Sequence, residues 1–456
     1  MGPEGSSLRR HLGASLSLGL PLIGSHLAQF AITLTDALML GWYDVAVLAG
    51  QVLGAMLFFV LFIMGSGLAF AVMPMVAEAA TRGQTARLRR VTRMGLWASA
   101  GFALAVMPIL LGAGAIFAAL GQPDGVAVRA GIYLDIAGWG MLPALAVMVL
   151  KSHLSALERA RAVLIVTLGA VALNAALNYA LIFGALGAPE LGLRGSAIAS
   201  VAVHLASALA LAVYAARALP GQTLFARLWR PDGAALAEVV RLGWPIGLTN
   251  LAEVGLFGAS SVMMGWVGTL PLAAHGIALQ IASVVFMLHL GLSNVATIRA
   301  GQAEGRGDRA ALRDGAVAVS LLSAGAALAT VAVFLTMPGA LIALFVDPAD
   351  PQAGRVIALG AGFVMAAALF QLFDAGQVIA LGLLRGVRDT RVPMLLAAIS
   401  YWIIGVPAGW ALAFPLGLGG IGIWLGLALG LAVAAMTMTA RFLGNLRMRA
   451  AAAPVS

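Results

Sequence analysis

Twelve long apolar runs follow one another along this chain of 456 residues. Each run is longer than about 20 residues, the length that an α-helix needs to cross the hydrocarbon core of a bilayer. A transmembrane β-barrel would instead alternate apolar and polar residues in segments of about ten residues. Charged residues make up 10% of the sequence, whereas a soluble domain carries about 25%. The sequence therefore predicts an all-α polytopic membrane protein with twelve transmembrane helices.

The runs and the basic residues together predict the topology. The runs cover residues 16–43, 48–77, 91–119, 126–155, 162–186, 193–216, 240–266, 271–302, 315–345, 353–384, 393–415 and 418–442. Of the 27 basic residues, all but Arg129, Arg194 and Arg355 lie at the chain ends or at the even-numbered connections, where Lys151 and Arg385 are also counted. Basic residues concentrate on the cytoplasmic side. Both termini are therefore expected in the cytoplasm, and no nucleic-acid partner is expected.

The chain also repeats itself, which predicts its domain organisation. At one constant offset Pro21 recurs as Pro245, Gly41-Trp42 as Gly265-Trp266, and Arg82-Gly83 as Arg306-Gly307. An even number of helices separates the copies, so the two halves are parallel repeats about an axis along the membrane normal. We expect one six-helix lobe at residues 1–217, a cytoplasmic linker at 218–237 and a second lobe at 238–456. Two such halves around a central cleft are typical of a transporter.

Four acidic residues lie inside the apolar runs, namely Asp36, Asp135, Glu253 and Asp374. A charge at the centre of a membrane helix costs about 2.5 to 3.5 kcal/mol on insertion scales, and such residues usually face a cavity with a functional role. Asn174 and Asn178 share one helix face because they are four residues apart. We expect Asp36, Asn174 and Asn178 to form one cation or proton site, and Glu253 with Asp374 to form another.

Structural roles remain open for the same residues. A buried carboxyl group can be protonated and simply pack, most plausibly so for Asp135, and asparagines in membrane helices often only join helices. The repeat favours function for the other acids, because it aligns Glu253 with Gln29 and Asp36 with Ser260, so the carboxyl groups differ between the halves. The two deep histidines of the eighth run are fourteen residues apart and are expected to be structural.

The energy source is inferred from the residues that the chain lacks. A phosphate-binding loop needs a lysine in a glycine-rich context, and the one lysine, Lys151, is not in such a context. The chain has no cysteine, which excludes disulfides and thiolate metal sites. No enzyme activity and no cofactor are expected. Transport would be coupled to an ion gradient, and a buried carboxyl group suits both a proton and a hard cation such as Na⁺.

The sequence resembles a known family of transporters. The segments PLIGSHLAQFAITLTDALMLGW, GWPIGLTNLAEVGLFGASSVMMGW, FQLFDAGQVIALGLLRGVRDTRVPM and SYWIIGVP are similar to those of multidrug and toxic compound extrusion (MATE) transporters of the norfloxacin-exporter type. The resemblance covers nearly the whole chain. It implies two six-helix lobes around a central cleft and the exchange of small cationic or aromatic drugs for Na⁺ or H⁺. It also suggests a monomer.

The resemblance assigns residues as well. Asp36 matches the acid of the first lobe and Asn174 and Asn178 match its polar pair; Glu253 and Asp374 match the acids of the second lobe; Phe286 matches an aromatic residue beside the cation; and Gln29 and Phe370 complete the expected surroundings of the cleft. At Phe370 this chain departs from some members of the family. An aromatic hydroxyl at this position would be a further cation ligand, and phenylalanine lacks it. The main alternative is a flippase for a lipid-linked precursor, and its anionic substrate would call for a basic cleft.

Overall fold

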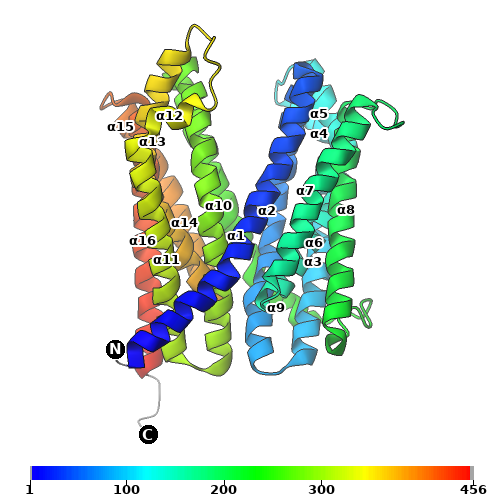
Figure 1. Cartoon of the computed structure of the whole chain (residues 1–456), viewed down its shortest axis with the longest axis vertical. Coiled ribbons are helices and arrows are strands. Elements are labelled where there is room, and N and C mark those ends of the chain that lie inside the picture. Colours follow the sequence, from blue (N-terminus) through cyan, green and yellow to red (C-terminus); the bar gives the residue numbers. More distant parts are fainter. Residues whose placement is uncertain (1–2, 452–456) are drawn as a thin grey trace. The chain divides into compact units, whose positions relative to one another are not determined.

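The computed structural model describes residues 3–451, which form helices joined by short connections (Figure 1). The helices are α1 (Pro3–Tyr43), α2 (Val45–Thr81), α3 (Thr85–Leu111), α4 (Ala113–Ala119), α5 (Asp124–Ala137), α6 (Met141–Ala156), α7 (Ala160–Phe183), α8 (Leu193–Ala218), α9 (Gly233–Val267), α10 (Thr269–Arg306), α11 (Arg309–Thr336), α12 (Pro338–Ala343), α13 (Ala353–Gly386), α14 (Arg391–Ala398), α15 (Val406–Ala413) and α16 (Gly419–Ala451). Within this described range, 12 helical spans are long and apolar enough to cross a membrane. The predicted fold class and number of spans are confirmed.

Two of the membrane spans consist of two α-helices joined by a turn of another helix type. A short 3₁₀ turn, Gly138–Gly140, joins α5 to α6 within one span. A seven-residue π-helix, Ile399–Gly405, joins α14 to α15 within another. Such π-helical turns are rare and often lie at functional sites, because the extra residue per turn changes which side chains share a face.

Several expected boundaries were wrong. The runs expected at 91–119 and 315–345 are each broken, into α3 with α4 and into α11 with α12. The second break precedes Pro338, which cannot donate its backbone nitrogen to a continuing helix. Arg385, which follows the run expected at 353–384, lies inside α13 and is buried. Lys151, which the run at 126–155 contains although it was counted at a connection, lies inside α6 and is buried. A basic residue near the end of a run can therefore still belong to the helix.

The chain forms two compact units. Unit 1 contains residues 1–23 and 249–456, and unit 2 contains residues 24–248. The divisions fall inside α1 and α9, a few residues after Pro21 and Pro245, the first matched pair of the repeat. Proline removes a hydrogen bond from the interior of a helix. The division of the sequence into two lobes joined by a linker at residues 218–237 stays a prediction.

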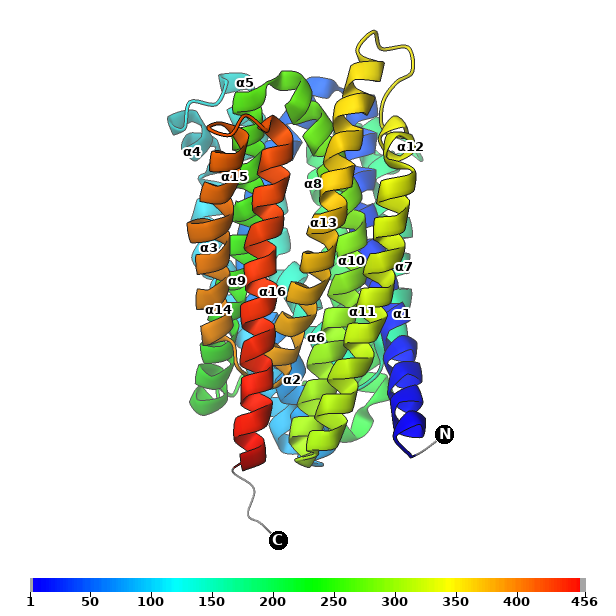
Figure 2. The same cartoon turned by 90° about the vertical axis from the view of Figure 1, so that its left-hand side faces the viewer.

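Close helix packing within each unit depends on small residues. In unit 1, α13 lies beside α10 and α16 (Figure 2). In unit 2, α7 lies beside α8, and α2 beside α3 and α6. A Cβ atom on Gly426 of α16 would lie 2.2 Å from the Cα of Gly409 on α15. Glycine is needed at this contact because lipid supplies no hydrophobic force between helices, which must approach closely to gain van der Waals contact.

In unit 2 the connection between α8 and α9 is fastened to α3. Arg93 Nη1 donates to the carbonyl oxygens of Ala226 and Arg227, each at 2.8 Å. Trp97 Nε1 donates to the carbonyl oxygen of Leu228 at 2.9 Å. Arg93 itself is buried. These bonds satisfy three backbone carbonyls of an irregular segment and hold it in place.

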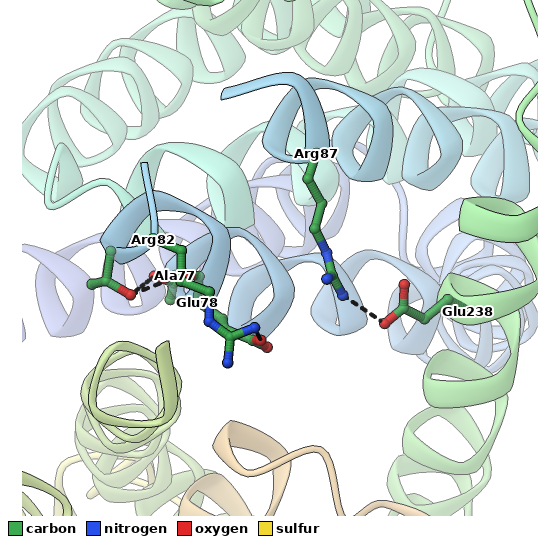
Figure 3. Close-up of polar contacts among 6 residues, drawn as sticks. Ala77, Glu78, Arg82, Arg87 and Glu238 are labelled. Atoms are coloured by element: carbon green, nitrogen blue, oxygen red, sulfur yellow. Dashed lines mark hydrogen bonds and ion pairs between the residues drawn. The ribbon is translucent and has the colours of Figure 1, made fainter. Parts of the chain in front are cut away.

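Ion pairs continue this attachment to the start of α9. Arg90 pairs with Asp232 at 3.4 Å and Arg87 with Glu238 at 3.1 Å, the latter drawn in Figure 3 beside the pair of Arg82 and Glu78. Asp232 also accepts a hydrogen bond from the backbone nitrogen of Ala235. This bond, followed by the charge of Arg90, holds the pKa of the Asp232 carboxyl below its usual value. Exposed pairs of this kind contribute about 0 to 1 kcal/mol each, so the buried Arg93 is the main attachment.

Gly426→Ala is expected to destabilise the protein, because the new methyl group overlaps Gly409. Overpacking of this kind costs about 1 to 3 kcal/mol. The melting temperature of the purified protein in detergent should fall. Gly169→Ala is the matched control, since a Cβ atom there meets nothing within 4 Å. Equal melting temperatures for the two variants would contradict the close packing of α15 on α16.

Arg93→Met is expected to release the connection between α8 and α9, because two carbonyl oxygens lose their donor. Limited trypsin digestion should then cut faster after Arg227, which is exposed in the connection and is followed by Leu228. The control is Arg82→Met, which removes the pair with Glu78 and leaves the hydrogen bonds of Arg93 to the connection in place. If Arg93→Met is cut no faster than Arg82→Met, the attachment through Arg93 is wrong.

Candidate functional site: two buried acidic clusters

Unit 2 holds a carboxylate surrounded by neutral hydrogen-bond donors. Asp36 of α1 is buried, and its Oδ1 accepts from Asn174 Nδ2 at 2.8 Å and from Asn178 Nδ2 at 2.5 Å. Ser200 Oγ of α8 is 3.5 Å from Asp36 Oδ2. The two asparagines lie on one face of α7, as their spacing requires. The expected convergence of Asp36, Asn174 and Asn178 is therefore present, and their role in transport stays a prediction.

Further polar groups belong to the same cluster. Tyr133 of α5 is buried, and its hydroxyl interacts with Ser200, with Gln51 of α2 and with the charge of Asp36. The side-chain oxygen of Asn178 has no hydrogen-bond partner among the residues that the structure describes. It can therefore accept from a ligand or bind a cation. Gln51 and Tyr133 escaped prediction because single polar residues in apolar runs carry no spacing signal.

Unit 1 holds a pair of carboxyl groups with few donors. Glu253 of α9 is 8% exposed and Asp374 of α13 is 1% exposed, and the charge of Glu253 acts on Asp374. Within residues 3–451, both oxygens of Asp374 and Oε1 of Glu253 lack a hydrogen-bond partner. Burying a charge without such partners is costly. This pair therefore has the chemistry of a site that takes up protons or cations.

A buried arginine lies near Glu253, the α9 member of the pair. Arg385 of α13 is 6% exposed, and its charge interacts with that of Glu253. Its Nη2 donates to the side-chain oxygen of Asn250 at 2.7 Å. Asn250 lies one turn before Glu253 on α9, so the two share a face. This residue escaped prediction because its position after the tenth apolar run assigned it to a connection. It lies eleven residues, close to three full turns, after Asp374 on α13.

The π-helix adds a tyrosine to the same place. Tyr401 is completely buried, and it interacts with Glu253, Asp374 and Arg385. In the part of the chain that the structure describes, its hydroxyl oxygen has no hydrogen-bond partner by distance and angle, and the same holds for both amide atoms of Gln377, one turn after Asp374. The neighbouring Trp402 donates to the carbonyl oxygen of Ala252 at 3.2 Å and so fixes the π-helix on α9.

An aromatic layer adjoins the carboxyl pair in unit 1. Phe257 lies one turn after Glu253, and Phe370 lies one turn before Asp374. Their ring centroids are 5.9 Å apart, and Phe370 also meets Trp424 at 5.6 Å. Phe370 therefore packs against aromatic rings, which accounts for the absence of a hydroxyl at this position.

The remaining candidates lie outside these contacts. Phe286 is half-buried on α10, and Gln29 is half-buried on α1, where it lines a small cavity of unit 2 with Thr167 and His204. Among the described residues, the donors to Asp36 and Asn250 are Asn174, Asn178, Ser200 and Arg385, and Gln29 and Phe286 are not among them. Asp135 is exposed on α5, so the expectation that it is a buried packing residue was wrong.

The two deep histidines of α10 have local hydrogen-bond partners. His289 Nδ1 lies 2.9 Å from Ser323 Oγ, and His275 Nε2 lies 3.3 Å from Ser260 Oγ. These contacts agree with the structural role that their separation suggested. Ser260 is the residue that the repeat aligns with Asp36, so a neutral pair occupies in unit 1 the position of the acid in unit 2.

Twelve apolar spans among the described residues, an internal repeat and a buried acidic cluster in each unit define a polytopic membrane protein with the architecture of a transporter. The MatE family model matches residues 21–180 and 245–411, and these two matches begin at the repeated Pro21 and Pro245. The chain belongs to the MatE family.

Curated relatives match over nearly their whole length. A protein of Rhizobium meliloti described as "Probable multidrug resistance protein NorM" is 48% identical, with 98% of this chain and 96% of the relative covered. A protein of the same description from Agrobacterium fabrum is 45% identical, with 97% and 96% covered. These relatives therefore support the assignment to the family over nearly the whole chain.

Solved structures share the fold. A structure described as the outward-facing conformation of a multidrug resistance MATE family transporter has a TM-score of 0.87, with 18% identity and 99% of each chain covered. The crystal structure of the eukaryotic MATE transporter AtDTX14 has a TM-score of 0.84, with 17% identity and 97% of this chain and 99% of that chain covered. At these identities the likeness concerns the fold alone.

The different surroundings of the acids predict different effects on stability. Asp36→Leu leaves Asn174 Nδ2 without its acceptor, at a cost of about 1 to 3 kcal/mol for an unsatisfied buried donor. Asn178 and Ser200 each lose one acceptor and keep Asn174 Oδ1 and the carbonyl oxygen of Ser196. Asp374→Leu removes a carboxyl group that accepts no hydrogen bond in the described structure. In detergent at neutral pH, Asp36→Leu should lower the melting temperature more than Asp374→Leu. The reverse order would contradict the hydrogen-bond pattern.

Proposed function

We propose that this chain is a secondary active antiporter that exports cationic and amphipathic drugs in exchange for Na⁺ or H⁺. The observation that carries the proposal is the presence of one buried acidic cluster in each unit, around Asp36 and around Glu253 with Asp374. The relatives described as probable multidrug resistance proteins support the drug substrates.

The carboxyl pair of unit 1 supports a role in exchange. Its unpartnered oxygens need a positive charge or a proton when they are buried, because an isolated charge in a low-dielectric interior is strongly disfavoured. A coupling cation, a proton and a cationic drug can each satisfy this need. They compete for it, so loading one expels another. Alternating access of the site to the two sides of the membrane would turn this competition into transport.

The aromatic layer supports the substrate class. Phe257, Phe370 and Trp424 lie within one turn of the carboxyl pair or in contact with that turn. Aromatic faces attract organic cations, especially in a desolvated site, and apolar surface tolerates many substrate shapes. An anionic lipid-linked precursor, the alternative substrate, would meet repulsion from Glu253 and Asp374.

Topology and assembly complete the proposal. The protein resides in the bacterial inner membrane with both termini in the cytoplasm, as the distribution of basic residues favours. It acts as a monomer, because each acidic cluster is built from helices of one chain. No nucleic acid or cofactor takes part, and the bilayer is its other partner.

Efflux from proteoliposomes is the test. Wild-type protein should export a fluorescent organic cation under a sodium gradient or a proton gradient, and the gradient that works identifies the coupling ion. Asp36→Asn, Glu253→Gln and Asp374→Asn should each lose most of this export, because the site loses its negative charge. Asp135→Asn is the matched control at an exposed acid and should export normally. Full export by Glu253→Gln would contradict the proposal.

A further inference from the structure

Arg385 is a buried basic residue for which the transport scheme above has no use. It lies in a helix that carries Asp374, and it faces the helix that carries Glu253, since it donates to Asn250 one turn away from that acid. Burying a guanidinium group costs several kcal/mol unless its charge is balanced. Glu253 supplies a negative charge in unit 1 that interacts with the charge of Arg385.

The charge of the whole unit 1 cluster follows from its members. With Glu253 and Asp374 ionised and Arg385 protonated, the formal charge is −1, and the nearby Tyr401 is neutral. One monovalent cation or one proton makes the cluster neutral. A divalent cation would leave the buried site with a formal charge of +1. Without Arg385 the cluster would carry −2, and a divalent cation would then make it neutral.

The acidic cluster of unit 2 reaches the same charge in another way. The hydrogen-bond partners of Asp36 are the neutral Asn174, Asn178 and Ser200. The single carboxylate gives a formal charge of −1 without any buried arginine. The two units therefore differ in their residues and agree in the charge that they present.

We propose that Arg385 sets the charge selectivity of the unit 1 site, so that it accepts monovalent organic cations and disfavours divalent ones. This inference rests on the proposed export of cations and names the class of cation that the site takes. Arg385 acts through Glu253 and is a positioning and charge-balancing residue. A purely structural arginine would affect the amount of folded protein but would not change the preference between cations of different charge.

Ethidium and propidium are suitable probes, because they share one aromatic ring system and carry one and two positive charges. Their binding to the purified full-length protein is measured by dye fluorescence in detergent, and their export is measured in proteoliposomes. Wild type should prefer ethidium. In Arg385→Gln the ratio of propidium affinity to ethidium affinity should rise about tenfold, which corresponds to about 1.4 kcal/mol. Arg385→Lys keeps the charge and should keep the wild-type ratio.

A charge-restoring double variant provides a second test should Arg385→Gln fail to fold. Glu253→Gln alone makes the cluster formally neutral, and its affinity for ethidium should fall about tenfold or more. Glu253→Gln combined with Arg385→Gln returns the cluster to −1 and should recover most of that affinity. A double variant as weak as Glu253→Gln would overturn the charge-balance argument.

The outcomes separate the two proposals. An unchanged dye ratio in a folded Arg385→Gln, with normal binding and export of ethidium, would overturn the role of Arg385 and leave drug export intact. Loss of selectivity in Arg385→Lys as well would also overturn it, because the charge is then not the cause. Failure of the wild type to bind or export either dye would overturn both proposals.

Discussion

The burial of carboxyl groups within membrane-spanning helices is the constraint on which the account of this protein depends. A carboxylate in such a place needs donors, a counter-charge or a proton. Unit 2 meets this need around Asp36 with fixed amide and hydroxyl donors. Unit 1 leaves three carboxyl oxygens of Glu253 and Asp374 without a donor in the described chain. The carboxylate of unit 2 thus has donors within the protein, whereas the carboxyl pair of unit 1 is ready to bind a cation or proton reversibly.

The fold makes this asymmetry possible on a repeated framework. The matched prolines, the matched family segments and the helices broken at corresponding places show two copies of one plan. Glycines such as Gly409 and Gly426 let helix backbones approach within each unit. On that framework the acids occupy different positions, with Asp36 aligned to Ser260 and Glu253 to Gln29. The order of the helices is therefore repeated in the two halves, whereas the positions of the acidic residues are not.

Much of this could be predicted from sequence because its signals are long or periodic. Apolar length predicted twelve spans, and the i, i+4 spacing predicted that Asn174 and Asn178 share one helix face. Their meeting with Asp36 was a hypothesis that rested on the three residues lying in the same half of the chain. The missed residues carry weaker signals. Arg385 sits near the end of an apolar run, where counting basic residues for topology assigns it to a loop. Tyr401 reaches the carboxyl pair through a π-helix, and the altered residue count per turn is invisible to a search based on 3.6 residues per turn.

The central claim is that a cationic drug displaces a proton or Na⁺ from the carboxyl pair of unit 1. The most direct measurement titrates the purified protein with ethidium and follows proton release in weakly buffered detergent solution, and displacement of ²²Na⁺ in a parallel sample. We predict that drug binding releases protons or sodium, and that Glu253→Gln combined with Asp374→Asn abolishes this release. Tight ethidium binding with release of neither cation would contradict it.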